Sequence, residues 1–294
     1  MAVGRVVLVA GVLILLFIPY LLWGTGLLTA RSQSQLRTEF GVAQHLSGPI
    51  PKQVPAATRS PASTSPPQVA PTEADPPPGS PVGIIAIPKI GLSMVVVEGT
   101  GTAQLDQGPG HYPGTPLPGE AGNVAIAGHR TTYLHPFYSL DALDPGDSIM
   151  LTTLQGFFLY HVLSSQAVSP SDVAVVGPTS TPQLTLTTCN PRYSASQRLV
   201  VHAALVASYI VHPRKAAAVS AEPTHGVPTA PSRSWPAAII WGIVVAGLTT
   251  AVWMAARRSR RGRRGLVIGV GTMVWLVVVF FFFQATAPLL PASF

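Results

Sequence analysis

Three long segments without a charged residue most constrain how this chain can fold: residues 6–23, 236–254 and 265–284. A helix of about 20 residues, at about 1.5 Å per residue, crosses a hydrocarbon core of about 30 Å. Charged residues make up only 10% of the chain, whereas a soluble domain carries about 25%. We therefore expect three transmembrane helices rather than an ordinary cytosolic protein.

The first segment has two readings. A secretory signal peptide has an apolar region of about 7–15 residues and ends in small residues. The run at 6–23 is longer, and the nearest small-residue site, at 28–30, begins with Leu28. We interpret residues 1–30 as an uncleaved membrane anchor, and a cleaved signal peptide is the alternative.

The orientation in the membrane follows from the arginines between the last two segments. Six arginines lie within residues 257–264, and such loops stay on the cytoplasmic side. Residues 235–285 then form a transmembrane hairpin, with a short tail at 286–294. Counting crossings predicts a multi-pass cell-membrane protein with a cytoplasmic N-terminus and residues 31–235 outside the cell.

Two stretches separate the membrane segments from a single soluble domain. Residues 31–81 are predicted to be an extracellular linker, because 48–81 hold eleven prolines without hydrophobic periodicity. Residues 213–234 are predicted to be a second linker. The domain between them, 82–212, has four basic and seven acidic residues and a net charge of −3. Nucleic-acid binding is excluded, since it needs a basic folded surface.

The domain has the pattern of a mostly-β fold. Short apolar or alternating runs, separated by turn residues, are typical of strands in a barrel or a sandwich. The runs are residues 83–88, 92–97, 123–128, 147–153, 157–164, 183–188 and 198–206.

Cys189 is the only cysteine of the chain, and it ends one of these strands. One interpretation is that Cys189 is a buried, unreactive thiol with a structural role. The alternative is a reactive thiol at a strand end. Arg198 begins the next strand, so an antiparallel pair would bring it beside Cys189, where a guanidinium stabilises a thiolate or an oxyanion. His129 ends another strand and is the usual kind of proton carrier for such a nucleophile.

These motifs together resemble the sortase family. They are Gly-His-Arg-Thr-Thr at 128–132, Thr-Leu-Thr-Thr-Cys at 185–189, and Arg198 nine residues later. The resemblance covers residues 82–208 and implies an eight-stranded sortase-type β-barrel with short helices. Further matches lie at 87–90 and 143–147.

The resemblance also implies the chemistry. Sortases are membrane-tethered cysteine transpeptidases without a cofactor. Cys189 would attack the Thr carbonyl of a C-terminal Leu-x-x-Thr-Gly sorting signal on a secreted protein, and an amine of the peptidoglycan precursor lipid II would release the product. His129 would protonate the leaving amine, and Arg198 would hold the oxyanion or the substrate backbone. Thr188 would assist through its backbone N–H or its hydroxyl.

Residues 111–115 and 119–124 are most similar to class E, the actinobacterial housekeeping type. Class E members prefer Ala at the second signal position, and Tyr112 is the candidate wall of that pocket; it could equally pack a loop. A pilus-polymerising, class C-like enzyme is an alternative because of the C-terminal apolar segments. A non-catalytic, membrane-held binding module is the alternative from another functional class.

Two other interpretations are weaker. An L,D-transpeptidase also uses Cys and His, but it expects Gly before the cysteine, where this chain has Thr188. No metal site is expected, because the histidines show no ligand spacing. Asp141, Asp144 and Asp147 are interpreted as turn residues rather than calcium ligands.

Overall fold

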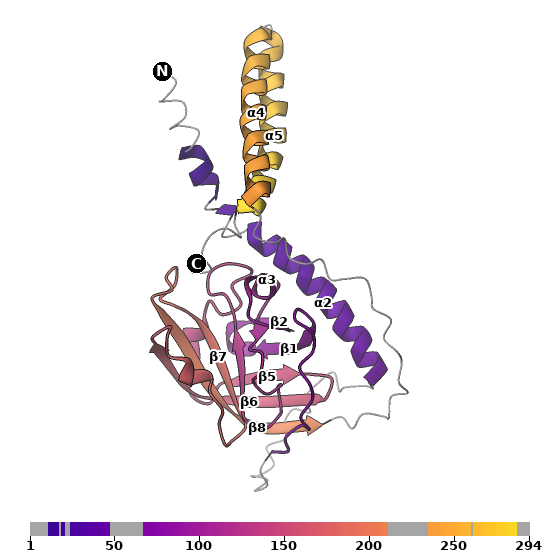
Figure 1. Ribbon diagram of the computed structural model, residues 1–294, viewed down its shortest axis with the longest axis vertical. Helices are drawn as coiled ribbons and strands as arrows, with labels where there is room; N and C mark the ends of the chain where they lie inside the picture. Colours follow the sequence, from indigo (N-terminus) through magenta and orange to yellow (C-terminus); the bar gives the residue numbers. More distant parts are fainter. Residues whose placement is uncertain are drawn as a thin grey trace. The chain divides into compact units, whose positions relative to one another are not determined.

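The computed structural model describes residues 11–17, 19–20, 24–47, 67–210, 235–259 and 261–286. They belong to two compact units. One contains a β-barrel and the long helix α2 (Thr25–Ser47), and the other contains helices α4 (Trp235–Arg258) and α5 (Arg261–Thr286) (Figure 1).

Eight strands close into a barrel in the spatial order β1-β2-β3-β4-β7-β8-β6-β5. They are β1 (Pro81–Ile87), β2 (Leu92–Glu98), β3 (Gly110–His111), β4 (Asn123–Ala127), β5 (Ser148–Thr152), β6 (Gly156–Val168), β7 (Gln183–Asn190) and β8 (Gln197–Ile210). The expected eight-stranded barrel is confirmed. Seven strands coincide with the runs seen in the sequence, whereas the two-residue β3 was not expected.

Short helical turns connect the strands, as expected. They are η2 (Pro88–Ile90), α3 (Thr102–Leu105), η3 (Leu140–Ala142) and η4 (Val173–Val176).

Alternate residues of the strands fill the barrel interior. On β7, Leu184 and Leu186 are fully buried in the main hydrophobic core, and on β8, Leu199 and Val201 join the same core. Because successive side chains of a strand point to opposite faces, the residues between them line the outside of the barrel wall. Burial of each such aliphatic side chain contributes about 1.5–3 kcal/mol.

The strand order brings three chain segments to one end of the barrel. Strands β4 and β7 are parallel neighbours, so their C-terminal ends lie together. Strand β8 is antiparallel to β7, so its first residues lie at this same end. His129, Cys189 and Arg198 come from these three segments.

Helix α2 belongs to the barrel unit, although the sequence assigned residues 31–47 to a linker. Its buried face consists of Thr25, Thr29, Gln33, Leu36 and Phe40, each at most 6% exposed. These positions recur every three or four residues, which is the period of one helix face. The face is largely polar, and therefore it has no apolar signature in the sequence.

Gln33 shows why this polar face is buried. Its side-chain amide donates to the Val95 carbonyl over 3.0 Å and accepts from the Val95 N–H over 2.7 Å. It also donates to the Gln107 carbonyl. Strand β3 pairs with β2 only at Val97 and Glu98, so α2 supplies partners for the β2 backbone beyond that short pairing.

Part of the proline-rich stretch also lies on the barrel. Ala70 is 4% exposed, and its N–H donates to the Gly119 carbonyl over 2.7 Å. The N–H of Glu73 donates to the Glu120 carboxylate. Residues 67–80 therefore pack against the domain that the sequence began at residue 82, whereas 48–66 lie outside the described residues.

Two helices in the second unit are long and apolar enough to cross a membrane: Trp235–Arg258 and Gly265–Thr286. The part of the chain that the structure describes therefore contains two candidate spans, where the sequence predicted three. Of the first segment, residues 11–17 are helical, and residues 6–10, 18 and 21–23 lie outside the described part. The predicted 213–234 linker and most of the 286–294 tail also lie outside it.

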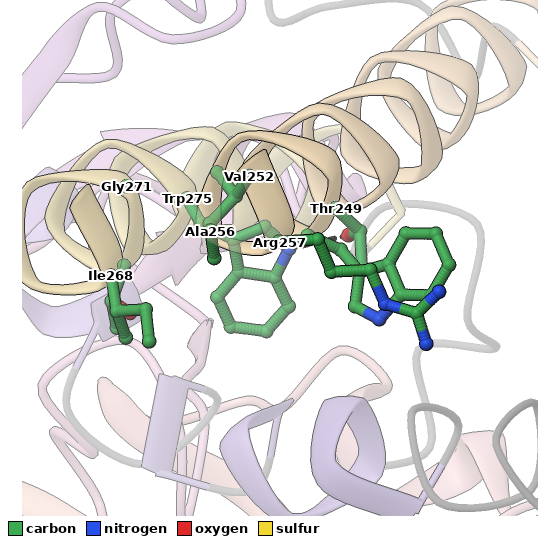
Figure 2. A pocket seen from close by; sticks show the side chains of 9 residues that line it. Thr249, Val252, Ala256, Arg257, Ile268, Gly271 and Trp275 are labelled. Carbon is green, nitrogen blue, oxygen red and sulfur yellow. Dashed lines mark hydrogen bonds between the residues drawn. The ribbon is translucent and has the colours of Figure 1, made fainter. Parts of the chain in front are cut away.

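A hollow of about 430 Å³ opens between α4 and α5 (Figure 2). The indole N–H of Trp275 donates to the Thr249 hydroxyl across it over 2.9 Å. The guanidinium carbon of Arg257 lies 3.8 Å from the centre of the Trp253 ring. Arginine and tryptophan are both typical of a membrane–water interface. The residues that the sequence singled out for chemistry lie in the other unit.

Candidate active site

Cys189 and Arg198 are direct cross-strand partners. The register of the antiparallel β7–β8 pair places Cys189 opposite Arg198, as the strand–loop–strand pattern predicted. Cys189 lies three residues after the core residue Leu186, and Arg198 lies one residue before the core residue Leu199. Because successive side chains of a strand point to opposite faces, Cys189 and Arg198 both lie on the outer face of the barrel wall. Side chains opposite one another on one face have Cβ atoms about 4.5–5.5 Å apart.

His129 reaches the same end through strand β4. In the parallel β4–β7 pair, Ala127 is the partner of Thr187. The pairing continues beyond the strand, because the Gly128 N–H donates to the Thr187 carbonyl over 3.1 Å and the Thr188 hydroxyl donates to the Gly128 carbonyl over 2.7 Å. His129 is therefore level with Cys189.

The two candidate accessory residues lie along β7. The Thr188 side chain is 3% exposed, and its hydroxyl proton is used in the bond to Gly128. The Thr188 hydroxyl therefore does not donate to a substrate in this arrangement. The Tyr112 hydroxyl lies 3.0 Å from the Thr187 hydroxyl, on the outer face that also carries Cys189.

Arg198 is held by its own loop. Its Nη1 donates to the carbonyls of Ala195 and Gln197, both over 3.2 Å. These bonds hold the guanidinium against its own loop at the start of β8, on the residue that pairs with Cys189.

Arg130 is a site residue that the sequence reasoning did not single out. Only 3% exposed, it donates from Nη1 to the Cys189 carbonyl over 3.0 Å and to the Asn190 side-chain oxygen over 2.7 Å. Its Nη2 forms an ion pair with Asp141 over 3.0 Å. Arg130 thus ties the loop after β4 to the end of β7. Its place directly after His129 was the one available signal.

The three aspartates interpreted as turn residues make two different kinds of contact. The Asp144 N–H donates to the Asp147 carboxylate over 2.6 Å, which is turn chemistry, and both carboxylates contact Lys89. Asp141 instead joins Arg130 to Arg192, which donates to both of its oxygens. Among the described residues, no cluster of His, Cys, Asp and Glu could hold a metal ion.

Burial sets the charge of the histidine. Desolvation lowers the pKa of His129 to about 4, so its imidazole is neutral at pH 7. Desolvation also raises the pKa of Asp106 to about 6, against a hydrogen bond from Tyr133 that lowers it. A neutral imidazole can accept a proton from a thiol and return it to an amine.

Chemically, this end of the barrel combines a partly exposed thiol, a neutral imidazole and a guanidinium. That set suits nucleophilic attack by sulfur on a carbonyl carbon, with proton transfer through the ring and an oxyanion held by arginine.

Comparison with known proteins agrees with this reading. A family model described as the sortase domain matches residues 85–206. Sortase SrtE1 of Streptomyces coelicolor is 31% identical over 221 residues, which are 70% of this chain and 56% of that protein. The chain belongs to the sortase family. Its similarity to a class E sortase agrees with the class that the sequence motifs indicated.

Other relatives match shorter parts of the chain. Sortase D of Bacillus subtilis is 34% identical over 114 residues, 38% of this chain and 56% of that protein. The solved sortase E of Streptomyces avermitilis is 38% identical, over 45% of this chain and 92% of that one, with a TM-score of 0.42. The chain spans about half the length of the curated relatives named here.

Proposed function

We propose that this protein is a membrane-held cysteine transpeptidase that cleaves a C-terminal sorting signal after Thr and joins the protein to an amine. The observation that carries the proposal is the register of β7 and β8, which sets Cys189 opposite Arg198 at the barrel end where β4 delivers His129.

The first half of the reaction forms an acyl-enzyme. Cys189 Sγ attacks the carbonyl carbon of the signal Thr, and His129, neutral at pH 7, takes the thiol proton. Arg198 donates to the oxygen that becomes negative. The Thr–Gly C–N bond breaks as His129 gives its proton to the departing glycine nitrogen, which leaves a thioester on Cys189.

The second half reverses these roles. The amine of a peptidoglycan precursor such as lipid II attacks the thioester carbon, and His129 takes a proton from that nitrogen. The new C–N bond forms, the C–S bond breaks, and the proton returns to sulfur. Cys189, His129 and Arg198 are then restored, and the cycle needs no cofactor.

We assign signal selection to Tyr112 and substrate alignment to Thr188. Tyr112 reaches the outer face of β7 at Thr187, two residues before the nucleophile, so it can border the pocket for the second signal residue. Thr188 holds β7 against the residue before His129, and this bond aligns the strand end that carries the nucleophile. The similarity to a class E sortase favours a Leu-Ala signal over a Leu-Pro one.

The membrane part supports the same function. The two apolar helices Trp235–Arg258 and Gly265–Thr286, with the arginines between them, support a barrel outside the cell by the positive-inside rule. Secreted proteins and peptidoglycan precursors meet on that side. A reporter fused after Phe294 should give an extracytoplasmic signal, and a cytoplasmic signal would refute the three-span topology.

The test of the reaction uses full-length protein in detergent with two matched peptides, Leu-Ala-x-Thr-Gly and Leu-Pro-x-Thr-Gly, and a glycine-based amine. Mass spectrometry should find the fragment ending in Thr joined to the amine, with more product from the Leu-Ala peptide. A product joined at another bond, or no reaction with either peptide, would contradict the proposal. A Tyr112→Ala variant should reduce the preference between the two peptides.

A further inference from the structure

Two buried polar atoms beside the candidate active site face each other without a hydrogen-bond partner among the described residues. They are Nε2 of His129 and Oδ1 of Asp106, and they lie 3.9 Å apart. The His129 side chain is 9% exposed and the Asp106 side chain 27%. Leaving a buried polar atom without a partner is unfavourable, so two of them this close together indicate a function.

Asp106 is fixed in place from several sides. It caps α3, where its N–H donates to the Thr102 carbonyl over 3.0 Å. Its own carbonyl accepts from the Thr29 hydroxyl of α2 over 2.8 Å. Its carboxylate accepts a hydrogen bond from the Tyr133 side chain. The Asp106 backbone is therefore held by helices α3 and α2, and its carboxylate is held by the loop after β4.

Tyr133 joins this group to the imidazole. Its ring stacks on that of His129, with centroids 4.8 Å apart and 30° between the ring planes. Movement of the His129 ring is restricted by this contact on one face. A shift of about 1 Å would bring Nε2 within the usual 2.7–3.2 Å of a hydrogen bond to Asp106. Hydrogen bonds of catalytic groups are often long in free enzymes and tighten in the substrate complex.

We propose that Asp106 is a positioning residue for His129, whose carboxylate accepts the Nε2–H and leaves Nδ1 to exchange protons with the reacting groups. The inference rests on the proposed transpeptidase function. It names a fourth side chain in the reaction, one that acts through the histidine rather than on the substrate.

The chemical reason is the charge that His129 acquires. When the imidazole takes the thiol proton it becomes a cation in a desolvated place, where its own charging is unfavourable. A carboxylate at about 4 Å stabilises that cation and fixes which nitrogen carries the proton. Asp106 is mostly ionised at pH 7.5, since burial raises its pKa only to about 6.

The test uses full-length protein in detergent and three variants. Asp106→Asn keeps an oxygen acceptor and removes the charge, whereas Asp106→Leu removes both. Asp144→Asn is the matched control, because that carboxylate is 80% exposed and contacts Lys89 instead. We expect kcat/KM for the signal peptide to fall at least about tenfold in Asp106→Leu, part of the 10²–10⁴ that general acid–base catalysis supplies. Asp106→Asn should fall less, and Asp144→Asn should stay within twofold of the wild type.

A second readout reports on the imidazole itself and does not depend on turnover. Nitrogen NMR of protein labelled at histidine should show His129 protonated at Nε2 in the wild type. In Asp106→Leu the tautomer should become mixed, and the pKa of His129 should fall. Unchanged NMR signals of His129 in that variant, or a kcat/KM within twofold of the Asp144→Asn control, would overturn the proposal. If wild-type protein cleaves neither peptide, the proposed transpeptidase function is wrong. The NMR result would still decide whether Asp106 contacts His129.

Discussion

Replacing Arg130 tests whether its buried side chain holds the nucleophile. Arg130→Leu removes two hydrogen bonds at the end of β7, to the Cys189 carbonyl and the Asn190 side chain, and one ion pair to Asp141. Hydrogen bonds that involve a charged group contribute about 1.5–3 kcal/mol each. Asp141 is 39% exposed and keeps Arg192 as a partner, so the ion pair adds little. We expect a loss of about 3 kcal/mol in the free energy of unfolding.

For a domain of this size that loss lowers Tm by about 6–12 °C. Activity should fall as well, because displacement of a reacting group by about 1 Å can cost about 10²-fold in rate. Thermal unfolding of the full-length protein in detergent gives the change in Tm. The effect on activity is given by kcat/KM for the signal peptide, measured well below the unfolding temperatures of the wild type and of Arg130→Leu.

Arg192→Leu is the matched control. Arg192 also contacts Asp141, but its side chain is 38% exposed, and exposed pairs contribute about 0–1 kcal/mol. Arg130→Lys should recover little, since a single ammonium cannot reach the three partners that the planar guanidinium serves. If Arg130→Leu is no less stable and no less active than Arg192→Leu, the reasoning about Arg130 is wrong.

Three further predictions follow from the site and from α2. Arg198→Lys should lose most turnover, about 10²–10³ in kcat, and Arg198→Ala at least as much, because a point charge lacks the planar fork of donors; a Lys variant within about threefold of wild type refutes the oxyanion role. His129 should make the protein less stable in acid: between pH 4 and 6.5 the unfolded chain binds a proton that the folded His129, with its pKa lowered to about 4, does not. The stability that depends on this neutral imidazole, up to about 3 kcal/mol, is therefore fully present above pH 6.5 and is lost as the pH falls to about 4. The free energy of urea unfolding should then depend less steeply on pH in His129→Gln than in wild type. Equal pH dependence in the two proteins would contradict the lowered pKa. Gln33→Ala should lower the free energy of unfolding by about 1–3 kcal/mol, because the Val95 N–H and carbonyl lose their partners. Thr38→Ala, at an exposed position of the same helix, is the control. Equal stability of the two variants would show that α2 is not docked on the barrel.

The sequence predicted the barrel because its strands carry their own signal. Alternating or continuous apolar runs at 123–128, 183–188 and 198–206 became β4, β7 and β8, and the strand–loop–strand pattern placed Arg198 opposite Cys189. The two-residue β3 has no such signal. It exists because Gly110 and His111 pair with neighbours on both sides.

Helix α2 and the contacts around the site depend on tertiary structure. Thr29 and Gln33 look like solvent-exposed polar residues in the sequence, and they are buried only because backbone groups of the barrel meet them. Arg130 pairs with residues 11 and 59–60 positions away. Asp106 and His129 are likewise far apart in the chain, and their approach follows from packing of α3 against the loop after β4. No local pattern encodes such pairings.

The central claim is that Cys189 is the nucleophile of an acyl transfer, and intact-mass spectrometry tests it most directly. Full-length protein is mixed with the signal peptide in the absence of an amine acceptor and quenched early. The account predicts a mass increase equal to the peptide fragment ending in Thr, carried by Cys189 and released by hydroxylamine, as expected of a thioester. Cys189→Ala should show no adduct and no cleavage while its barrel stays folded. Cleavage of the peptide by Cys189→Ala, or an adduct on another residue, would contradict the account.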